Sequence, residues 1–249
     1  MRAILALQIL LVGNVFATEK LPDLAIEEIQ ENVYLHKSFS RVEGFGLVSS
    51  NGLIVVDDGK AFIVDTPWSE EDTVKLAKWI DDKNYELVGS ISTHSHEDRT
   101  AGIRWLNERS VSTYASSLTN EALKKESKEL AKYSIGDTEL LAGDQIEAFY
   151  PGGGHSIDNI VVWLPHSKIL FGGCLVRSLA SKSLGYTGEA YIEQWASSVE
   201  KVLLRYPGAN IVVPGHGKMG GIKLLKHTKQ LAQLASNKSI QSTAKGSPD

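Results

Sequence analysis

The stretch that decides the fold reads Leu87-Val88-Gly89-Ser90-Ile91 and, after Ser92 and Thr93, His94-Ser95-His96-Glu97-Asp98. The apolar part predicts a buried β-strand, and the small residues that follow at Ala101-Gly102 favour a corner into a helix. Side chains of an extended segment alternate between faces, so His94 and His96 share a side and can reach one ion. Asp98 lies past the strand end, where a turning backbone can direct its carboxylate to a neighbouring ion. A single histidine is more often an ordinary loop or core residue, but three ligand-type side chains at this spacing predict a metal site.

Other ligand-type side chains also follow a short β-like run and a glycine. His155 comes after Gly152-Gly153-Gly154, Cys174 comes after Gly172-Gly173, and His216 lies within Pro214-Gly215-His216-Gly217. Glycine permits close backbone approach and positive φ, which a tight strand-end turn with an inward-facing ligand requires. A lone cysteine is more commonly a small buried apolar residue, but this position favours a ligand thiolate. The other histidines have polar neighbours and are predicted to be surface residues: His36, His166 and His227.

The candidates divide into two sets of three ligands, His94 with His96 and His155, and Asp98 with Cys174 and His216. Three protein ligands leave one position of a tetrahedral zinc open, which is typical of catalytic sites. Imidazole and thiolate ligands favour zinc over magnesium or calcium, which prefer oxygen. Since two adjacent ions can share and activate one water molecule, the predicted chemistry is metal-assisted hydrolysis.

Beyond these ligands, the sequence resembles a known family, the metallo-β-lactamases, and within it the di-zinc subclass B1 of the imipenem-hydrolysing type. The similarity extends along essentially the whole mature chain, and its motifs are Val42-Glu43-Gly44-Phe45-Gly46, Asp65-Thr66-Pro67-Trp68, Thr93-His94, Gly172-Gly173-Cys174-Leu175 and the turn at Leu184-Gly185. The resemblance implies an α/β fold, the αβ/βα four-layer sandwich, with the site in a groove at its edge. It implies two Zn²⁺ ions per chain, one held by each ligand set. It also implies hydrolysis of the β-lactam ring of penicillins, cephalosporins and carbapenems, which gives antibiotic resistance.

The resemblance also implies roles for single residues. Water activated by the zinc of the three-histidine set attacks the lactam carbonyl, since zinc lowers the pKa of bound water to about 7. Asp98 orients the second ion, which stabilises the departing amide nitrogen. Arg177 anchors the substrate carboxylate where many relatives carry lysine, and its planar fork suits a carboxylate. Phe45 lies in a segment that resembles the family's mobile flap, although an ordinary hairpin tip fits it equally well. Tyr186 stands where many relatives have asparagine, so we expect a bulkier substrate contact there.

Two alternative functions follow from the same residues. One is a hydrolase of the same superfamily that acts on a thioester or a lactone. The wider superfamily usually places a histidine directly after the aspartate, whereas this chain has Arg99 there, and this difference and the ligand Cys174 argue against that alternative. The other is a periplasmic zinc-binding protein without catalysis, but such a site would be closed by four protein ligands.

Composition and the N-terminal residues set the remaining limits. The 249 residues, 42% of them hydrophobic, suit one domain, predicted over 18–249. Residues 1–17 have the charged, apolar and small-residue regions of a secretory signal, which predicts cleavage after Ala17 and a periplasmic protein. That apolar stretch is too short to span a membrane.

Loss of Arg2 with the signal takes the net charge from −4 to −5, which argues against nucleic-acid binding. We expect a monomer with a small-molecule substrate and, since Cys174 is the only cysteine, no intrachain disulfide.

Periodicity indicates alternating strands and helices. Seven runs predict strands: 53–56, 61–64, 87–92, 145–150, 160–164, 169–172 and 210–213. Ser69, with Asp72 three residues on, predicts a helix start before Leu76, Trp79 and Ile80. Two more amphipathic helices are predicted in the second half, from Ile192, Trp195, Val199 and Leu203 and from Leu224, Leu231 and Leu234. Because helices separate strands in both halves, we expect a layered sandwich whose ligands lie on loops at one edge.

Overall fold

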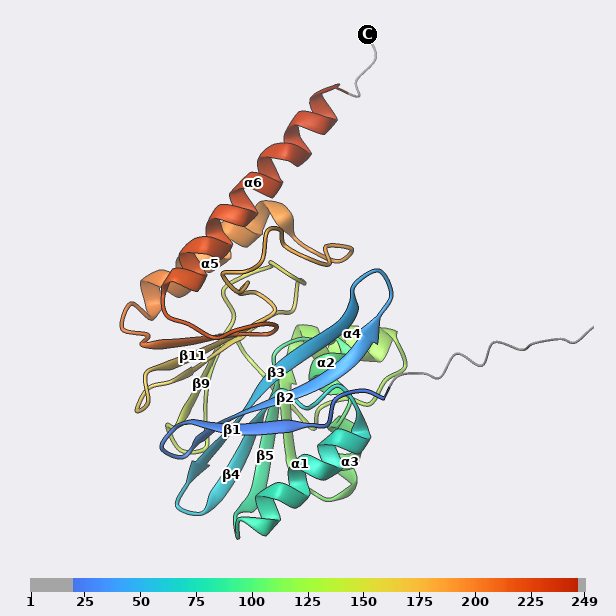
Figure 1. Ribbon diagram of the computed structural model, residues 1–249, viewed down its shortest axis with the longest axis vertical. Helices are drawn as coiled ribbons and strands as arrows, with labels where there is room; N and C mark the ends of the chain where they lie inside the picture. Colours follow the sequence, from blue (N-terminus) through green and yellow to red (C-terminus); the bar gives the residue numbers. More distant parts are fainter. Residues whose placement is uncertain (1–19, 246–249) are drawn as a thin grey trace, which may run out of the picture.

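The computed structural model describes residues 20–245 and consists of two β-sheets packed face to face, with helices on both outer faces (Figure 1). The first sheet has seven strands in chain order: β1 Ala25–Gln30, β2 Val33–Val42, β3 Gly46–Asp57, β4 Lys60–Val64, β5 Glu86–Ser92, β6 Ser112–Ser116 and β7 Tyr133–Ile135. The second sheet has the order β12-β11-β10-β9-β8: β12 Ile211–Pro214, β11 Ile169–Gly173, β10 Val161–Leu164, β9 Ile146–Phe149 and β8 Thr138–Leu141. The helices are α1 Glu70–Asp82, α2 Glu97–Thr100, α3 Ile103–Glu108, α4 Ser117–Lys125, α5 Ile192–Arg205 and α6 Lys223–Lys245. The predicted four-layer sandwich is confirmed.

The main core lies between the two sheets. Leu53 and Val55 of β3 face this core, where they pack with Phe171 of β11. Ile54 and Val56, which alternate with them, belong to a separate cluster on the opposite face of the sheet. Because both faces of β3 are buried over residues 53–56, this part of its sequence is a continuous apolar run rather than an alternating one.

The outer helices pack on these sheets through single apolar faces. The side chain of Ser69 caps α1 by accepting a hydrogen bond from the backbone N–H of Asp72, as predicted. Leu76 and Ile80 of α1 are buried against the first sheet. On the other side, α5 and α6 pack against each other and cover the second sheet (Figure 1). Trp195 is the largest fully buried side chain there.

The two sheets are joined at one edge by backbone hydrogen bonds. The N–H of Asn51 in β3 donates to the carbonyl of Gly215 at 2.9 Å, just after β12. The N–H of Ile160 donates to the carbonyl of Thr93 at 2.9 Å, just after β5. Strands β4 and β5 are parallel, as are β11 and β12, so loops that follow their carboxyl ends meet at this edge. This edge therefore brings together the segments that carry the predicted ligands.

One prediction about the histidines is wrong. His36 is not a surface residue but lies in β2 with 1% of its area exposed, and its Nε2 is 2.9 Å from the backbone oxygen of Asp65. The missing side chain of Gly52 makes room for this ring, because a Cβ at that position would collide with it. Burial lowers the pKa of His36 to about 4, so the ring is neutral at pH 7.

The predicted signal segment, residues 1–17, lies outside the described residues. Within residues 20–245, no helix is long and apolar enough to cross a membrane.

Candidate metal centre

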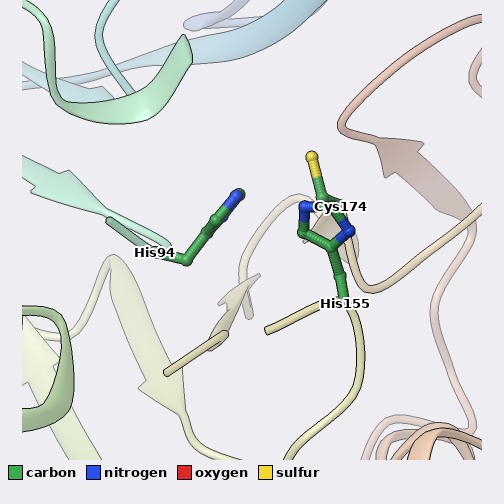
Figure 2. A group of neighbouring side chains, drawn as sticks. All are labelled: His94, His155 and Cys174. Atoms are coloured by element: carbon green, nitrogen blue, oxygen red, sulfur yellow. The ribbon is translucent and has the colours of Figure 1, made fainter. Parts of the chain in front are cut away.

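All six predicted ligands lie beyond the carboxyl end of a strand, at the edge where the sheets are joined. They come from four separate segments: the β5–α2 corner, the β9–β10 loop and the segments after β11 and β12. The six residues are His94, His96, Asp98, His155, Cys174 and His216. Their ligand atoms fall into three overlapping groups of three, and within each group all atoms lie within 4.8 Å of one another. Figure 2 shows His94, His155 and Cys174 converging from three segments on one space.

Asp98, Cys174 and His216 lie together, as the sequence predicts. His216 Nε2 is 3.3 Å from Asp98 Oδ2 and 3.2 Å from Cys174 Sγ. Cys174 Sγ is 4.0 Å from the same carboxylate oxygen. Burial would raise the pKa of Asp98, but the charges of Arg99 and His216 outweigh it and hold this pKa below its usual range.

The rings of the three-histidine set also lie near one another, although the mutually close groups of ligand atoms place His94 either with His96 and Asp98 or with His155 and Cys174. The rings of His94, His96 and His155 have centroids 4.6 to 5.0 Å apart. His155 Nε2 lies 3.1 Å from His96 Nδ1, so these two nitrogens face each other. Burial keeps the pKa values of His94 and His155 well below the usual range, which leaves both rings neutral and able to offer a lone pair.

The chemistry of these donors fits zinc. His94 Nε2 is buried and has no hydrogen-bond partner among the described residues, as expected of an atom that binds an ion. Burial raises the pKa of the Cys174 thiol to about 12, partly opposed by the charge of Arg99. A thiolate at this position is therefore formed when a cation binds beside it. Imidazole and thiolate together select a borderline-soft metal.

Arg99, which the sequence marked only as a difference from the wider superfamily, lies at the centre of the buried contacts behind the site. It is fully buried and its guanidinium reaches Asp98 Oδ2 at 2.8 Å, Asp65 Oδ2 at 3.1 Å and Cys174 Sγ at 3.0 Å. It also donates to the carbonyl oxygens of Asn51 and Gly215, at 2.7 and 3.2 Å. An arginine after an aspartate carries no pattern that marks it as buried. Arg99 therefore supports two of the predicted ligands from behind and is not available as a substrate-binding cation.

The predicted substrate-binding residues line a groove of about 610 Å³ above the ligands. Arg177 is half-buried, and its guanidinium packs beneath Gly185, where a Cβ would come within 2.8 Å of it. Tyr186 is 48% exposed and its ring lies 6.1 Å from that of His96. Phe45 is 54% exposed at the tip of the β2–β3 hairpin and lines the same groove.

Two further groove residues have roles that the motifs did not indicate. Trp68 lines the groove with its ring 5.9 Å from His216, although the sequence marked it only as part of a family motif. Glu189 bonds to His96 Nε2 at 2.9 Å, and as a single exposed acid in a loop it carried no signal.

Comparison with known proteins identifies the family. A family model described as the metallo-beta-lactamase superfamily matches residues 45–216. A metallo-beta-lactamase type 2 from Pseudomonas aeruginosa is 46% identical over 213 residues, which cover 85% of each chain. A protein with the same description from Bacteroides fragilis is 37% identical over 226 residues, covering 90% of this chain and 89% of its own.

Similar solved structures point to the same family. The DIM-1 metallo-β-lactamase exposed to ceftazidime has a TM-score of 0.86 and 63% identity, covering 87% of this chain and 100% of its own. TMB-1 has a TM-score of 0.85 and 64% identity over the same shares. The predicted family and enzyme class are confirmed. The chain belongs to the metallo-β-lactamase family, in its class B1, and is a metal-dependent hydrolase of β-lactams.

Proposed function

We propose that the chain is a di-zinc β-lactamase that hydrolyses penicillins, cephalosporins and carbapenems and so gives antibiotic resistance. The observation that carries this proposal is the arrangement of six ligand-type side chains at the base of a groove lined by Arg177. His94, His96 and His155 would hold one zinc ion. Asp98, Cys174 and His216 would hold the other. Bound zinc supplies Lewis acidity and makes water a nucleophile at neutral pH.

The protein's own residues bind and orient the substrate. Every classical β-lactam carries a carboxylate beside the ring, and Arg177 offers a cation with a planar fork at the groove wall. The Nε of Arg177 is buried without a partner among the described residues, and burial lowers the pKa of this side chain, so a substrate anion would compensate a desolvated charge.

Apolar groove side chains complete the substrate site in this proposal. Phe45 and Trp68 supply apolar surface that excludes water from the bound β-lactam ring. Tyr186 contacts the substrate beside His96 and His155. Asp98 acts as an oriented ligand, since Arg99 and the Ser50 hydroxyl, 3.4 Å away, hold its carboxylate in place.

A chelator experiment tests the proposal. We expect hydrolysis of a carbapenem to stop when a chelator removes the metal and to return when zinc is added. Metal analysis of the active protein should find two zinc ions per chain. Full carbapenem hydrolysis by a verified metal-free sample would contradict the mechanism. A thioester serves as the comparison substrate, and faster turnover of it than of a penicillin would contradict the substrate class.

The same proposal places the enzyme in the periplasm as a monomer. The support is the signal-like sequence of residues 1–17 and the protection that zinc would give the single thiol, Cys174, in an oxidising compartment. Cell fractionation, the N-terminal sequence of the mature protein and its mass in solution test these statements.

A further inference from the structure

Glu189 contacts a candidate metal ligand from outside both ligand sets. It lies between β11 and α5, 93 residues along the chain from His96, and its Oε2 is 2.9 Å from His96 Nε2. Among residues 20–245, no other carboxylate outside the six candidate ligands pairs with a candidate histidine: Asp98, which pairs with His216, is itself a candidate ligand, and His166, which pairs with Asp144, is not.

The contact selects one tautomer of His96. A neutral imidazole carries a proton on one nitrogen and a lone pair on the other, and a metal ligand must present the lone pair to the ion. A carboxylate oxygen accepts hydrogen bonds, so this contact favours the tautomer of His96 that carries its proton on Nε2. Nδ1 then keeps its lone pair, and this atom faces the cluster, 3.1 Å from His155 Nε2.

The other histidines show why His96 needs this partner. His94 and His155 are buried, with 0% and 6% of their area exposed, and packing holds their rings. Among the described residues, His155 Nδ1 has no hydrogen-bond partner, and His94 Nδ1 has a hydroxyl only at 3.5 Å. The side chains of His96 and His216 are each 23% exposed, and each has a short hydrogen bond on the nitrogen that faces away from the cluster. For His216 the acceptor is the backbone oxygen of Ser49, at 2.7 Å.

The segment that carries Glu189 is itself fixed beside the cluster. The N–H of Tyr191 donates to the carbonyl of Gly154 at 2.8 Å, directly before His155. Tyr186, three residues before Glu189, lies over the rings of His96 and His155. The carboxylate is thus held on the groove wall, 53% exposed, with its acceptor directed at His96.

We propose that Glu189 is a positioning residue that fixes the ring and tautomer of His96 for the ion of the three-histidine set. The inference rests on the proposed function in that His96 is taken as a metal ligand. A carboxylate that accepts from a metal-binding histidine also makes the imidazole more basic, and loss of such a partner lowers metal affinity about 10- to 100-fold. The ion beside Cys174 should keep its affinity.

Three variants test this role. Glu189→Ala removes the acceptor, Glu189→Gln keeps an acceptor oxygen without the charge, and Glu193→Ala removes an exposed acid at the start of α5 as the matched control. Zinc affinity is measured by competition with a chromophoric chelator, and each protein is also loaded with cobalt(II). The ligand-field absorption reports the geometry of the cobalt ions, and thiolate-to-cobalt charge transfer reports the ion beside Cys174 as an internal reference.

We expect Glu189→Ala to bind one of its two zinc ions about 10- to 100-fold more weakly. Its cobalt ligand-field absorption should change while the charge-transfer band stays. Glu189→Gln should fall between this variant and the wild type, because a neutral acceptor is about half as strong as a charged one. Glu193→Ala should match the wild type.

Glu189→Ala with wild-type zinc affinity and an unchanged cobalt spectrum would overturn the proposal, and so would a Gln variant as weak as the Ala variant. Equal weakening of both ions would also overturn it, because that result indicates general damage to the fold. These readouts do not use β-lactam turnover. A wild-type protein that binds two zinc ions but hydrolyses no β-lactam would therefore refute the proposed function and leave this inference standing.

Discussion

Replacing Arg99 with alanine should strongly destabilise the protein, although the residue touches neither substrate nor solvent. Its side chain is 0% exposed, as is that of Asp65, and the side chain of Asp98 is 6% exposed. The guanidinium lies at ion-pair distance from both buried carboxylates, and its charge opposes the rise to about 7 that burial causes in the pKa of Asp65. Breaking a buried ion pair by removing one partner costs about 3 to 5 kcal/mol, because the remaining charge stays desolvated. Arg99→Ala also removes the donors to two buried carbonyl oxygens, those of Asn51 and Gly215.

Denaturant unfolding followed by far-ultraviolet circular dichroism measures this loss in the zinc-loaded protein. A domain has only about 5 to 15 kcal/mol of stability, so the unfolding midpoint should fall by a large fraction. Arg99→Lys should be intermediate, since lysine restores the charge but cannot extend donors to both carboxylates. Lys78→Ala is the control, because its exposed pair with Asp82 should contribute little. A loss below about 1 kcal/mol in Arg99→Ala would refute the reasoning.

Three further changes have measurable outcomes. Arg177→Ala should lower kcat/KM about 10- to 100-fold by removing a charge-assisted contact of about 1.5 to 3 kcal/mol, with zinc content unchanged and with lysine restoring most of the loss. Unchanged kinetics on several carboxylate-bearing substrates would assign that contact elsewhere. Cys174→Ser should chiefly weaken the ion of its own set, since a hydroxyl is a poorer zinc ligand, and two tightly held ions by metal analysis would contradict the ligand assignment. His36 has a pKa of about 4 when folded against an ordinary value of about 6.5, so the unfolded chain binds more protons between these values and stability is lost as pH falls through this window, by up to about 3 kcal/mol. The unfolding free energy of His36→Gln should change less steeply with pH in this window than that of the wild type. Identical slopes in the two proteins would contradict the assignment of this pH dependence to His36.

The sequence by itself determined the elements that are buried on both faces and the identity of the candidate ligands. The seven predicted runs overlap β3, β4, β5 and β9 to β12, and strands such as β4 and β11, which are covered on both faces, leave a continuous hydrophobic signal. In β9 the signal is weaker, because Glu147 interrupts the apolar residues. Strands with more polar residues left no such signal. β1 reads Ala-Ile-Glu-Glu-Ile-Gln and β6 reads Ser-Thr-Tyr-Ala-Ser, and both form because a neighbouring strand supplies hydrogen bonds.

Tertiary structure alone decided which polar side chains support the site. His36 is buried because Gly52 on the adjacent strand leaves space for its ring. Arg99 reaches Asp65, 34 residues away, and Cys174, 75 residues away, while Glu189 reaches His96 across 93 residues. Periodicity and turn chemistry describe interactions between residues close in the chain. These contacts exist because two sheets, assembled from distant segments, meet at one edge, and that meeting leaves no local pattern in the sequence.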